Sequence, residues 1–282
     1  FEPERERERD TSAARSCAAQ RSSGSGQDRA RGSRPEPAVA GSKSEKRAAA
    51  RGGGVVAGTM TLFRFAGDMI HLASFGILFR RMLQARSVEG LSLKTQELYL
   101  LVFMTRYLDL FNFARVDFLH VYNFCMKIVY LSASATIVYY IRRKQPWKAT
   151  YKPGEDSFLH VQYAIAPCAV LALLVHSEFS FMEVLWTFSI YLEAIAIMPQ
   201  LILMQRYGNI ENLTANYVFC LGAYRGLYVL NWVWRYAMDT HYHVSKVSWI
   251  VWISGLIQTA LYCDFFYYYA MSKWYNKTML PK

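Results

Sequence analysis

The sequence predicts an all-α membrane protein with seven transmembrane helices, and three observations lead to this fold class. The chain is 53% hydrophobic and 16% aromatic, with a net charge of +11. Almost all of its aromatic residues lie in apolar segments of about 20 residues, which is the length of a membrane-spanning helix. Basic residues gather in alternate loops between these segments, as they do where alternate loops face the cytosol. The predicted spans are 61–79, 95–113, 118–141, 158–176, 181–204, 214–236 and 248–271.

Residues 1–59 precede these spans, and we expect them to form a disordered tail. They hold 12 Lys/Arg and 8 Asp/Glu, and Phe1 is their only aromatic residue. Such a segment buries too little apolar surface to offset its chain entropy. Its many acids argue against a nucleic-acid-binding arm or a transit peptide. Because the first methionine is Met60, we interpret 1–59 as a translated upstream region and 60–282 as the working seven-helix domain.

The predicted spans carry ionisable residues in an unusually consistent way. The fourth span is the exception, with only His160 and His176 near its ends. Charged groups inside membrane helices usually face the interior of the bundle and mark a binding site or a pathway. The ionisable residues of the other spans are Arg64, Asp68 and His71; Arg106 and Asp109; Lys127; Glu183 and Glu193; Arg225 and Arg235; and Asp264.

The loops predict the orientation of the chain. Arg80, Arg81 and Arg86 follow the first span, and the loop 142–152 adds two arginines and three lysines. The loops on the opposite side hold few basic residues. By the positive-inside rule, the C-terminus is cytosolic and residue 60 lies on the luminal or outer side.

A weak internal repeat relates the second span to the sixth. Sliding the chain by 119 residues superposes Thr95 on Thr214, Arg106 on Arg225, and Asn112 on Asn231. This repeat predicts two three-helix units joined by the fourth helix. In proteins built this way, binding sites lie between the two halves, near the middle of the membrane.

Three spans carry their polar residues on one helical face. The sixth span has the clearest face, because Arg225 and Arg235 have no acidic neighbour within one turn. An isolated arginine in hydrocarbon costs about 2.5–3.5 kcal/mol, so we expect this face to line a polar cavity or to meet an anion. The faces are Arg225, Tyr228, Trp232 and Arg235; Arg64, Asp68 and His71; and Glu183, Trp186, Ile190 and Glu193.

If these faces converge, they form a cavity that is rich in arginine. Arginine is preferred over lysine where carboxylates are bound through two hydrogen bonds, so the predicted ligand is an anion with more than one carboxylate. For Arg64 with Asp68, and for Arg106 with Asp109, the alternative is local neutralisation that only permits burial.

The aromatic residues and the histidine of these faces also have two interpretations. Trp186, Tyr228 and Trp232 are either site residues or ordinary aromatic residues of the membrane interface. As a site residue, Trp186 beside Glu183 can hold a ligand cation. His71 is either a neutral core histidine or a group that titrates near neutral pH.

The sequence contains no motif of an enzyme or a metal site. HExxH, GxSxG, a Gly-rich phosphate loop and CxxC are all absent. The five cysteines have no metal-binding spacing, and four of them lie in apolar segments as small hydrophobic residues. We therefore expect a protein that is not an enzyme and needs no cofactor or metal.

Several motifs follow one another along the chain: they include Leu62-Phe63-Arg64-Phe65, Arg106-Tyr107-Leu108-Asp109-Leu110-Phe111, Tyr224-Arg225-Gly226-Leu227-Tyr228 and Tyr262-Cys263-Asp264-Phe265-Phe266-Tyr267. Pro199-Gln200 alone would indicate only the wider group of PQ-loop proteins and SWEET transporters. Together, these motifs closely resemble the KDEL receptor family, also called ER lumen protein-retaining receptors. The resemblance covers Met60 to the C-terminus.

The resemblance implies a SWEET-like arrangement of seven helices, with a luminal N-terminus and a cytosolic C-terminus. It implies a receptor of the ER and cis-Golgi membranes that binds the C-terminal Lys/His-Asp-Glu-Leu signal of escaped ER luminal proteins in a pH-dependent way. The loaded receptor returns to the ER in COPI vesicles, so the implied partners are these luminal proteins and the COPI coat.

The resemblance also implies residue roles. Arg64, Arg106, Tyr107, Arg225 and Arg235 match positions that bind the carboxylates of the signal, and Glu183 and Trp186 match those that meet its Lys or His. His71 matches the proposed pH sensor, coupled to Glu193 and Tyr224. Asp264 matches a position needed for recycling, and Lys277 fits the lysine of the cytosolic retrieval signal or a simple positive-inside anchor. The predicted binding set also contains Asp109, Asn112, Tyr228, Asn231 and Trp232.

Two luminal segments depart from the family pattern. The loop 236–246 is longer than expected, and Asp239 is the candidate for an acidic residue that the family has near the cavity mouth. The turn 112–117 also looks extended, which affects the match of Asn112. Two other function classes stay open: a SWEET-like transporter, whose neutral sugar would need no cluster of arginines, and a structural membrane protein without a ligand.

Overall fold

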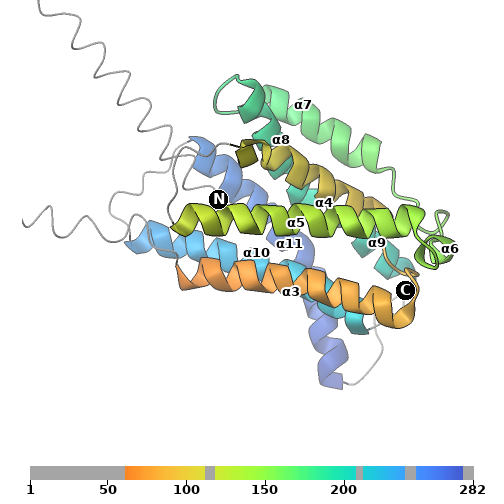
Figure 1. Ribbon diagram of the computed structural model, residues 1–282. Helices are drawn as coiled ribbons and strands as arrows, with labels where there is room; N and C mark the ends of the chain where they lie inside the picture. Colours follow the sequence, from red (N-terminus) through yellow and green to blue (C-terminus); the bar gives the residue numbers. More distant parts are fainter. Residues whose placement is uncertain (1–60, 112–117, 208–211, 239–245, 276–282) are drawn as a thin grey trace, which may run out of the picture. The chain divides into compact units, whose positions relative to one another are not determined.

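The computed structural model describes residues 61–111, 118–207, 212–238 and 246–275, and the predicted tail 1–59 lies outside them (Figure 1). Within these ranges the regular elements are all helices, and none is a strand. The described residues belong to one unit of the chain, Gly58–Lys282. The elements are α3 (Leu62–Ala85), α4 (Leu93–Arg106), η1 (Leu108–Phe111), α5 (Phe118–Arg143), α6 (Trp147–Thr150), η2 (Val161–Ile165), α7 (Ala166–Leu174), α8 (Phe181–Ile195), α9 (Met198–Tyr207), α10 (Asn212–Met238) and α11 (Lys246–Tyr275).

Three helices begin at a hydroxyl side chain that accepts a backbone hydrogen bond of the first turn. Thr61 precedes α3 and accepts from the amide of Arg64, 3.2 Å away. Ser92 does the same for α4 with Thr95, at 3.1 Å. Ser180 accepts from the amide of Glu183 at the start of α8. Each cap satisfies one of the amides that the first turn of a helix leaves free.

Four helices of the described ranges are long and apolar enough to cross a membrane: Leu62–Ala85, Phe118–Arg143, Phe181–Tyr207 and Trp249–Met271. The prediction of an all-helical membrane protein is therefore confirmed at this level. The remaining predicted spans are also helical, but two are short. α4 has 14 residues, and the apolar stretch through η2 and α7 covers Val161–Leu174. α10 is long, with 27 residues.

The fifth predicted span is interrupted between α8 and α9. α8 ends at Ile195 and α9 starts at Met198, directly before Pro199. Proline has no amide hydrogen and its ring clashes with the carbonyl group four residues earlier, which is that of Ile195. The predicted span 181–204 is found as the candidate membrane span Phe181–Tyr207, and the proline divides it into α8 and α9.

Arg81 has a different role from the one expected. The sequence predicts that Arg81 follows the first helix as a loop charge, but α3 continues to Ala85 and Arg81 is buried. Its guanidinium group donates to the carbonyl oxygens of Ser87 and Glu89, and its Nε donates to the hydroxyl of Thr214, 3.2 Å away. Arg81 therefore fixes the turn after α3 and joins it to α10.

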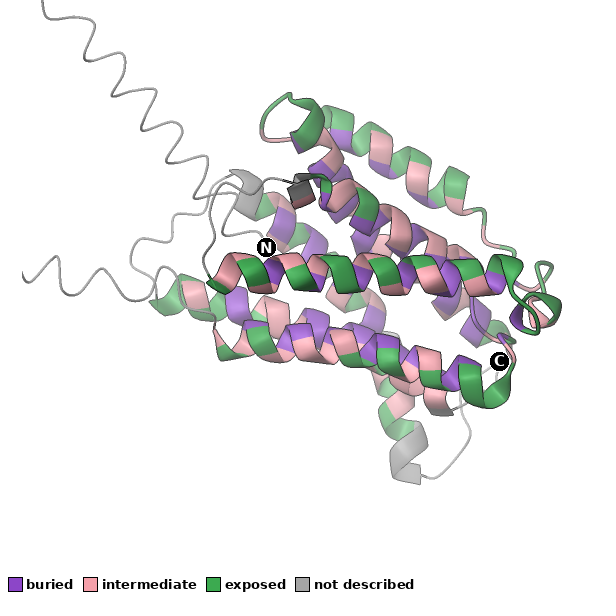
Figure 2. Ribbon diagram, viewed as in Figure 1, coloured by how far each residue is buried: buried purple, intermediate pink, exposed green. Residues whose placement is uncertain are grey.

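The described helices pack in a closed sequence of neighbours. α3 lies against α10, α10 against α11, α11 against α8, α8 against α4, α4 against α5, and α5 against α3. α7 packs on the outside of α8 (Figure 1). The side chains that face between these helices are buried, while much of α5 and α7 is exposed (Figure 2). These exposed faces carry large apolar side chains such as Tyr139, Leu173 and Leu174, as expected for surfaces in contact with lipid.

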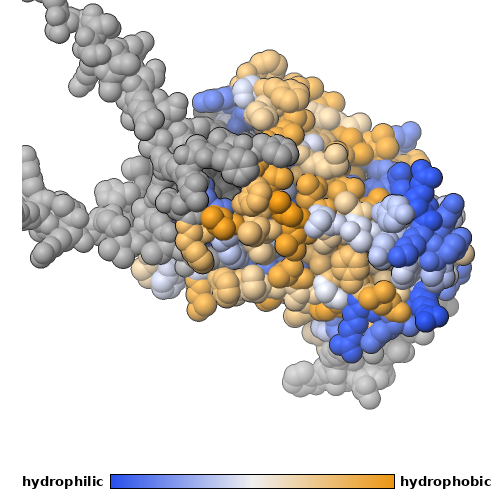
Figure 3. Space-filling view, in the orientation of Figure 1, coloured by the Kyte–Doolittle hydropathy of each residue, from blue (hydrophilic) through white to orange (hydrophobic). Residues whose placement is uncertain are grey.

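A hydrophilic end closes the bundle near α6 (Figure 3). Two buried polar side chains organise it. The Asp156 carboxylate accepts from the Ser92 hydroxyl at 2.9 Å, from the Tyr151 hydroxyl at 3.0 Å and from the amide of Lys94. Burial, and then the nearby Asp156 carboxylate, raise the pKa of Tyr151, so its hydroxyl remains a donor. The Gln200 amide bonds both to Gly90 and to Ser92, which ties α9 to the start of α4.

Candidate ligand-binding site

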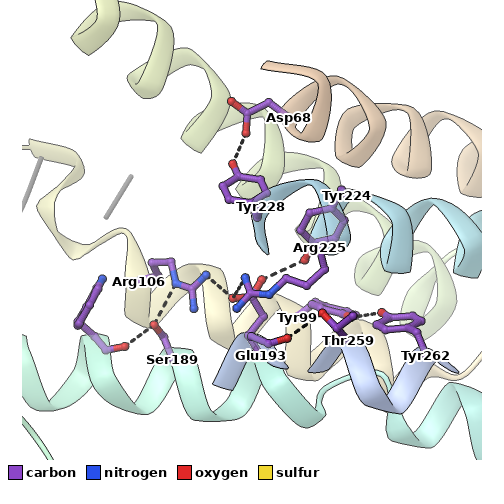
Figure 4. A network of polar contacts seen from close by, with 12 residues as sticks. Asp68, Tyr99, Arg106, Ser189, Glu193, Tyr224, Arg225, Tyr228, Thr259 and Tyr262 are labelled. Carbon is purple, nitrogen blue, oxygen red and sulfur yellow. Dashed lines mark hydrogen bonds and ion pairs between the residues drawn. The ribbon is translucent and has the colours of Figure 1, made fainter. Parts of the chain in front are cut away.

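Charged side chains of three helices, α4, α8 and α10, meet around the buried carboxylate of Glu193 on α8 (Figure 4). Arg106 of α4 places its Nη1 2.5 Å from Oε2, and Arg225 of α10 places its Nη1 3.6 Å from the same oxygen. Oε1 accepts a hydrogen bond from the hydroxyl of Tyr224, at 3.0 Å. Arg106 also donates from Nε to Ser189, one turn earlier on α8. We call Arg106, Glu193 and Arg225 the Glu193 centre.

The Glu193 centre joins the two halves of the predicted repeat. Arg106 and Arg225 are the arginines that the 119-residue repeat superposes, and both contact one carboxylate. Arg106 thus pairs with an acid of another helix, Glu193. Two positive groups share one negative group, so these three side chains together carry excess positive charge.

A second group of polar side chains lies around Asp68 on α3. Its Oδ2 accepts from the hydroxyl of Tyr122 at 2.9 Å, and its Oδ1 accepts from that of Tyr228. One turn away, Arg64 donates from Nη2 to Asn123 on α5, at 2.9 Å. Asp68 and Arg64 are both buried, so the first predicted face does point into the bundle. We call this group the Asp68 centre.

His71 lies between these two centres. Its ring stacks on that of Tyr224, with 4.0 Å between centroids and 4° between planes. It also stacks on Tyr130, at 4.5 Å. Tyr224 bonds to Glu193, and the hydroxyl of Tyr130 donates to the backbone carbonyl of Asp68. The structure therefore brings the three predicted pH-sensing residues, His71, Tyr224 and Glu193, into contact in that order.

The aromatic side of the site is formed by Trp186 and Trp232. They pack with Ile190 and Val251 in one buried cluster. The guanidinium carbon of Arg225 lies 5.3 Å from the ring centroid of Trp232, close enough for a cation–π contact. Both tryptophans are almost fully buried, whereas an aromatic residue of the membrane interface faces the lipid headgroups.

The other predicted site residues are placed as follows. Glu183 is buried at the start of α8 and accepts from the hydroxyl of Ser177 at 2.5 Å. Asn231 is buried and accepts from the hydroxyl of Thr61. Tyr107 is buried at the end of α4, and the Lys127 ammonium lies 5.8 Å from its ring centroid. Arg235 is half-buried near the end of α10.

Some predicted residues cannot be placed. Asn112, Asp239 and Lys277 lie outside the described residues. Asp109 in η1 and Asp264 in α11 have described backbones only.

Sequence reasoning missed the polar residues of α5. Asn123 and Tyr130 contact the Asp68 centre, but only Lys127 of this helix had been considered. A signal was present: Asn123, Tyr130 and Ser134 are spaced i, i+7 and i+11, which places them on one face of an otherwise apolar helix. All three are buried.

Comparisons with known proteins identify similar chains. A family model described as ER lumen protein retaining receptor matches residues 87–235. An ER lumen protein-retaining receptor of Petunia hybrida is 53% identical over 221 residues, which are 78% of this chain and 98% of that protein. Receptor B of Arabidopsis thaliana is 51% identical over 224 residues, 79% of this chain and 100% of its own length. A Drosophila melanogaster receptor of the same name is 47% identical over 210 residues, 74% of this chain and 93% of that protein.

Proposed function

The chain belongs to the family of ER lumen protein-retaining receptors, and from this premise we propose that it binds the C-terminal Lys/His-Asp-Glu-Leu signal of escaped ER luminal proteins. The loaded receptor would then carry these proteins from the Golgi back to the ER. Its ligand is a short peptide end with three carboxylates, from Asp, Glu and the chain terminus, and one cation at the first position.

The Glu193 centre is the observation that carries this proposal. The buried Arg225 and the partly buried Arg106 both contact the Glu193 carboxylate. A carboxylate that enters from a ligand is stabilised beside two guanidinium groups, because hydrogen bonds between charged groups are stronger than neutral ones. Arginine can bind a carboxylate through two parallel hydrogen bonds, which adds geometric selectivity. A neutral sugar would leave the excess positive charge without a counter-charge.

The remaining groups suit the rest of the signal. Arg64 of the Asp68 centre and the half-buried Arg235 supply further positive charge for the Asp and Glu side chains. Glu183 and Trp186, one turn apart on α8, form an acidic and aromatic corner for the Lys or His of the signal. We assign Arg235 to the luminal mouth and Arg225 to the deeper position, so that the peptide terminus finishes near Arg225 and Arg106.

His71 is the proposed pH sensor. Protonation of its ring would add positive charge beside Tyr224, which bonds to Glu193, and the two arginines of that centre lie beyond it. Added positive charge favours an anionic ligand, so binding takes up a proton. Affinity therefore increases as pH falls, which suits capture in the more acidic Golgi and release in the ER.

The helix contacts support a SWEET-like arrangement of seven spans. The first unit would be α3, α4 and α5, and the second α8–α9, α10 and α11. α3 contacts α10 and α4 contacts α8, so the first helix of each unit meets the second helix of the other. This exchange is what two related units around a pseudo-two-fold axis produce. η2 and α7, which pack on α8, would be the linker span.

The proposal includes the orientation of the chain in the membrane and the residues that return it to the ER. The basic loops support a cytosolic C-terminus and a luminal position for the N-terminal end of the domain 60–282. A cytosolic C-terminus lets Lys277 act in retrieval through the COPI coat, with Asp264 on the last helix needed for recycling.

Peptide binding to the purified full chain in detergent micelles tests the function. A fluorescent peptide that ends in HDEL with a free carboxylate should bind, and the same peptide with an amidated C-terminus should bind at least about tenfold more weakly, because it lacks one charged group. A neutral sugar in excess is the control, and should not compete. Equal affinity for the two peptides, or competition by the sugar, contradicts the proposal and favours a transporter.

A further inference from the structure

The inward face of α11 contains a glutamine whose amide group has no partner. Gln258 has no exposed surface, and neither Nε2 nor Oε1 makes a hydrogen bond. Buried polar groups in proteins are almost always hydrogen-bonded, so an amide in this state calls for an explanation. The buried residues of this face are Val251, Ser254, Gly255, Gln258, Tyr262 and Phe265.

A second buried glutamine shows the usual situation. Gln200 is also fully buried, but its Nε2 donates to the carbonyl of Gly90 and its Oε1 accepts from the amide of Ser92, both at 2.9 Å. Gln200 therefore has a structural role that its contacts explain. The contacts of Gln258 give no such explanation.

The neighbours of α11 place Gln258 at the level of Arg225. A Cβ atom added at Gly222 of α10 would meet Tyr262 and Phe266, and one added at Gly255 would meet Trp232. The two helices are therefore antiparallel, and Gln258 lies between these two contact points. The Cβ built at Gly255, one turn before Gln258, would lie 3.5 Å from Nη2 of Arg225.

Arg225 has an unused donor of its own. It is 4% exposed, and its Nε makes no hydrogen bond. Its Nη1 is directed to Glu193. Arginine can only donate, while the glutamine amide offers two N–H donors and one acceptor. The α10–α11 interface thus holds buried N–H donors without an acceptor next to a centre with excess positive charge, and a carboxylate is the group that such donors bind most strongly.

We propose that Gln258 is a further ligand-binding residue of this receptor. Its Nε2–H and the Nε–H of Arg225 both donate to the terminal carboxylate of the bound peptide, which thereby links α11 to α10. This assignment rests on the proposed function and adds the last helix to the groups that read the peptide terminus. The ligand class is a carboxylate at the end of a peptide chain.

Two variants of Gln258 test this assignment in the full chain. Gln258→Met keeps the length of the side chain and removes both donors. Gln258→Glu replaces the donors by a carboxylate that can itself pair with Arg225. We measure the Kd of the free-acid and the amidated HDEL peptides, together with the thermal midpoint without ligand.

The expected result separates binding from stability. Gln258→Met should weaken binding of the free-acid peptide at least about tenfold. Its affinity for the amidated peptide should stay close to that of the parent. Its thermal midpoint without ligand should equal or exceed that of the parent. Gln258→Glu should raise the ligand-free midpoint and bind the free-acid peptide still more weakly, because its carboxylate occupies the donors.

Two control variants change polar side chains that we do not expect to contact the peptide. Thr259→Val removes the neighbouring hydroxyl, which donates within α11 to the carbonyl of Gly255, 2.8 Å away. Ser134→Ala removes another buried polar group without a partner, on α5. Both should leave the affinity for the free-acid peptide within about twofold of the parent.

Three results would contradict the role of Gln258 or the proposed function. If Gln258→Met binds the free-acid peptide as the parent does, the inference is wrong. It is also wrong if this variant loses affinity for both peptides equally and unfolds at a lower temperature, because Gln258 then acts only on the fold. A parent chain that binds the two peptides equally contradicts the proposed function itself, whatever the variants do.

Discussion

At the scale of single residues, Glu193 is the group on which the site depends. Its two oxygens hold Arg106, Arg225 and Tyr224, which come from α4 and α10. Each arginine alone would be a costly buried charge. One acid on α8 therefore contacts arginines of two other helices and holds their guanidinium groups close together.

Glu193→Ala should destabilise the ligand-free protein by about 3–5 kcal/mol, because it leaves two buried guanidinium groups without their carboxylate. Thermal unfolding in detergent measures the change. Glu97→Ala is the matched control: it removes a carboxylate from an ion pair with Arg142, whose side chain is 58% exposed. Such pairs contribute about 1 kcal/mol or less. Similar losses in the two variants would contradict a special role for Glu193.

His71→Ala should remove most of the pH dependence of peptide binding. The parent is expected to bind more tightly as pH falls from about 7.5 to about 5.5, since an anionic ligand stabilises the protonated imidazole. The variant lacks this group, so its Kd should change little over the same range. His160→Ala, whose ring lies 3.8 Å from Glu97 near the hydrophilic end, should keep the parent profile. An unchanged profile in His71→Ala would rule His71 out as the sensor.

The sequence predicted which residues would be buried here better than it predicted their partners. Arg64, Asp68 and His71 share one face by spacing alone, and all three are buried. By contrast, the acid nearest to Arg106 along the chain is Asp109, whereas the contact seen is with Glu193 on another helix. The spacing of residues along the chain predicts which side chains share a helical face. It does not predict which helices pack together, and the contacts between helices depend on that packing.

At the scale of elements, helix ends were harder to predict than helix cores. α4 ends at Arg106, although apolar residues continue beyond it and no glycine or proline marks the end. Pro199 did provide a signal for the break after α8, but the apolar composition of 181–204 outweighed it. Arg81 was placed in a loop for the same reason: the apolar pattern of the first span fades before α3 ends.

Asp156→Ala should lower the free energy of unfolding by about 1–3 kcal/mol, because the buried donors of Ser92 and Tyr151 and the amide of Lys94 lose their acceptor. Thermal unfolding measures this, and peptide affinity should not change. Glu89→Ala is the control, since its half-exposed carboxylate bonds to the exposed Lys152. A loss of peptide affinity in Asp156→Ala at temperatures where it remains folded would show that the hydrophilic end is coupled to the site.

At the scale of the whole domain, the repeat explains why the site lies where it does. Thr95 and Thr214 are equivalent positions, and each accepts a hydrogen bond that ties its helix to a neighbour, from the amide of Gln200 and from Arg81. Arg106 and Arg225 are equivalent as well, and they meet at Glu193. The repeat and its seven-span arrangement remain proposals, which the meeting of Arg106 and Arg225 at one carboxylate supports.

The central claim is that the terminal carboxylate of the peptide is bound at the Glu193 centre. A double-mutant cycle tests it most directly, with free-acid and amidated HDEL peptides measured against the parent and Arg106→Gln by calorimetry. We predict that amidation weakens binding at least about tenfold in the parent but clearly less in the variant, since one of the groups that bind the terminal carboxylate is already lost. Equal losses on amidation in the parent and in Arg106→Gln would contradict the account.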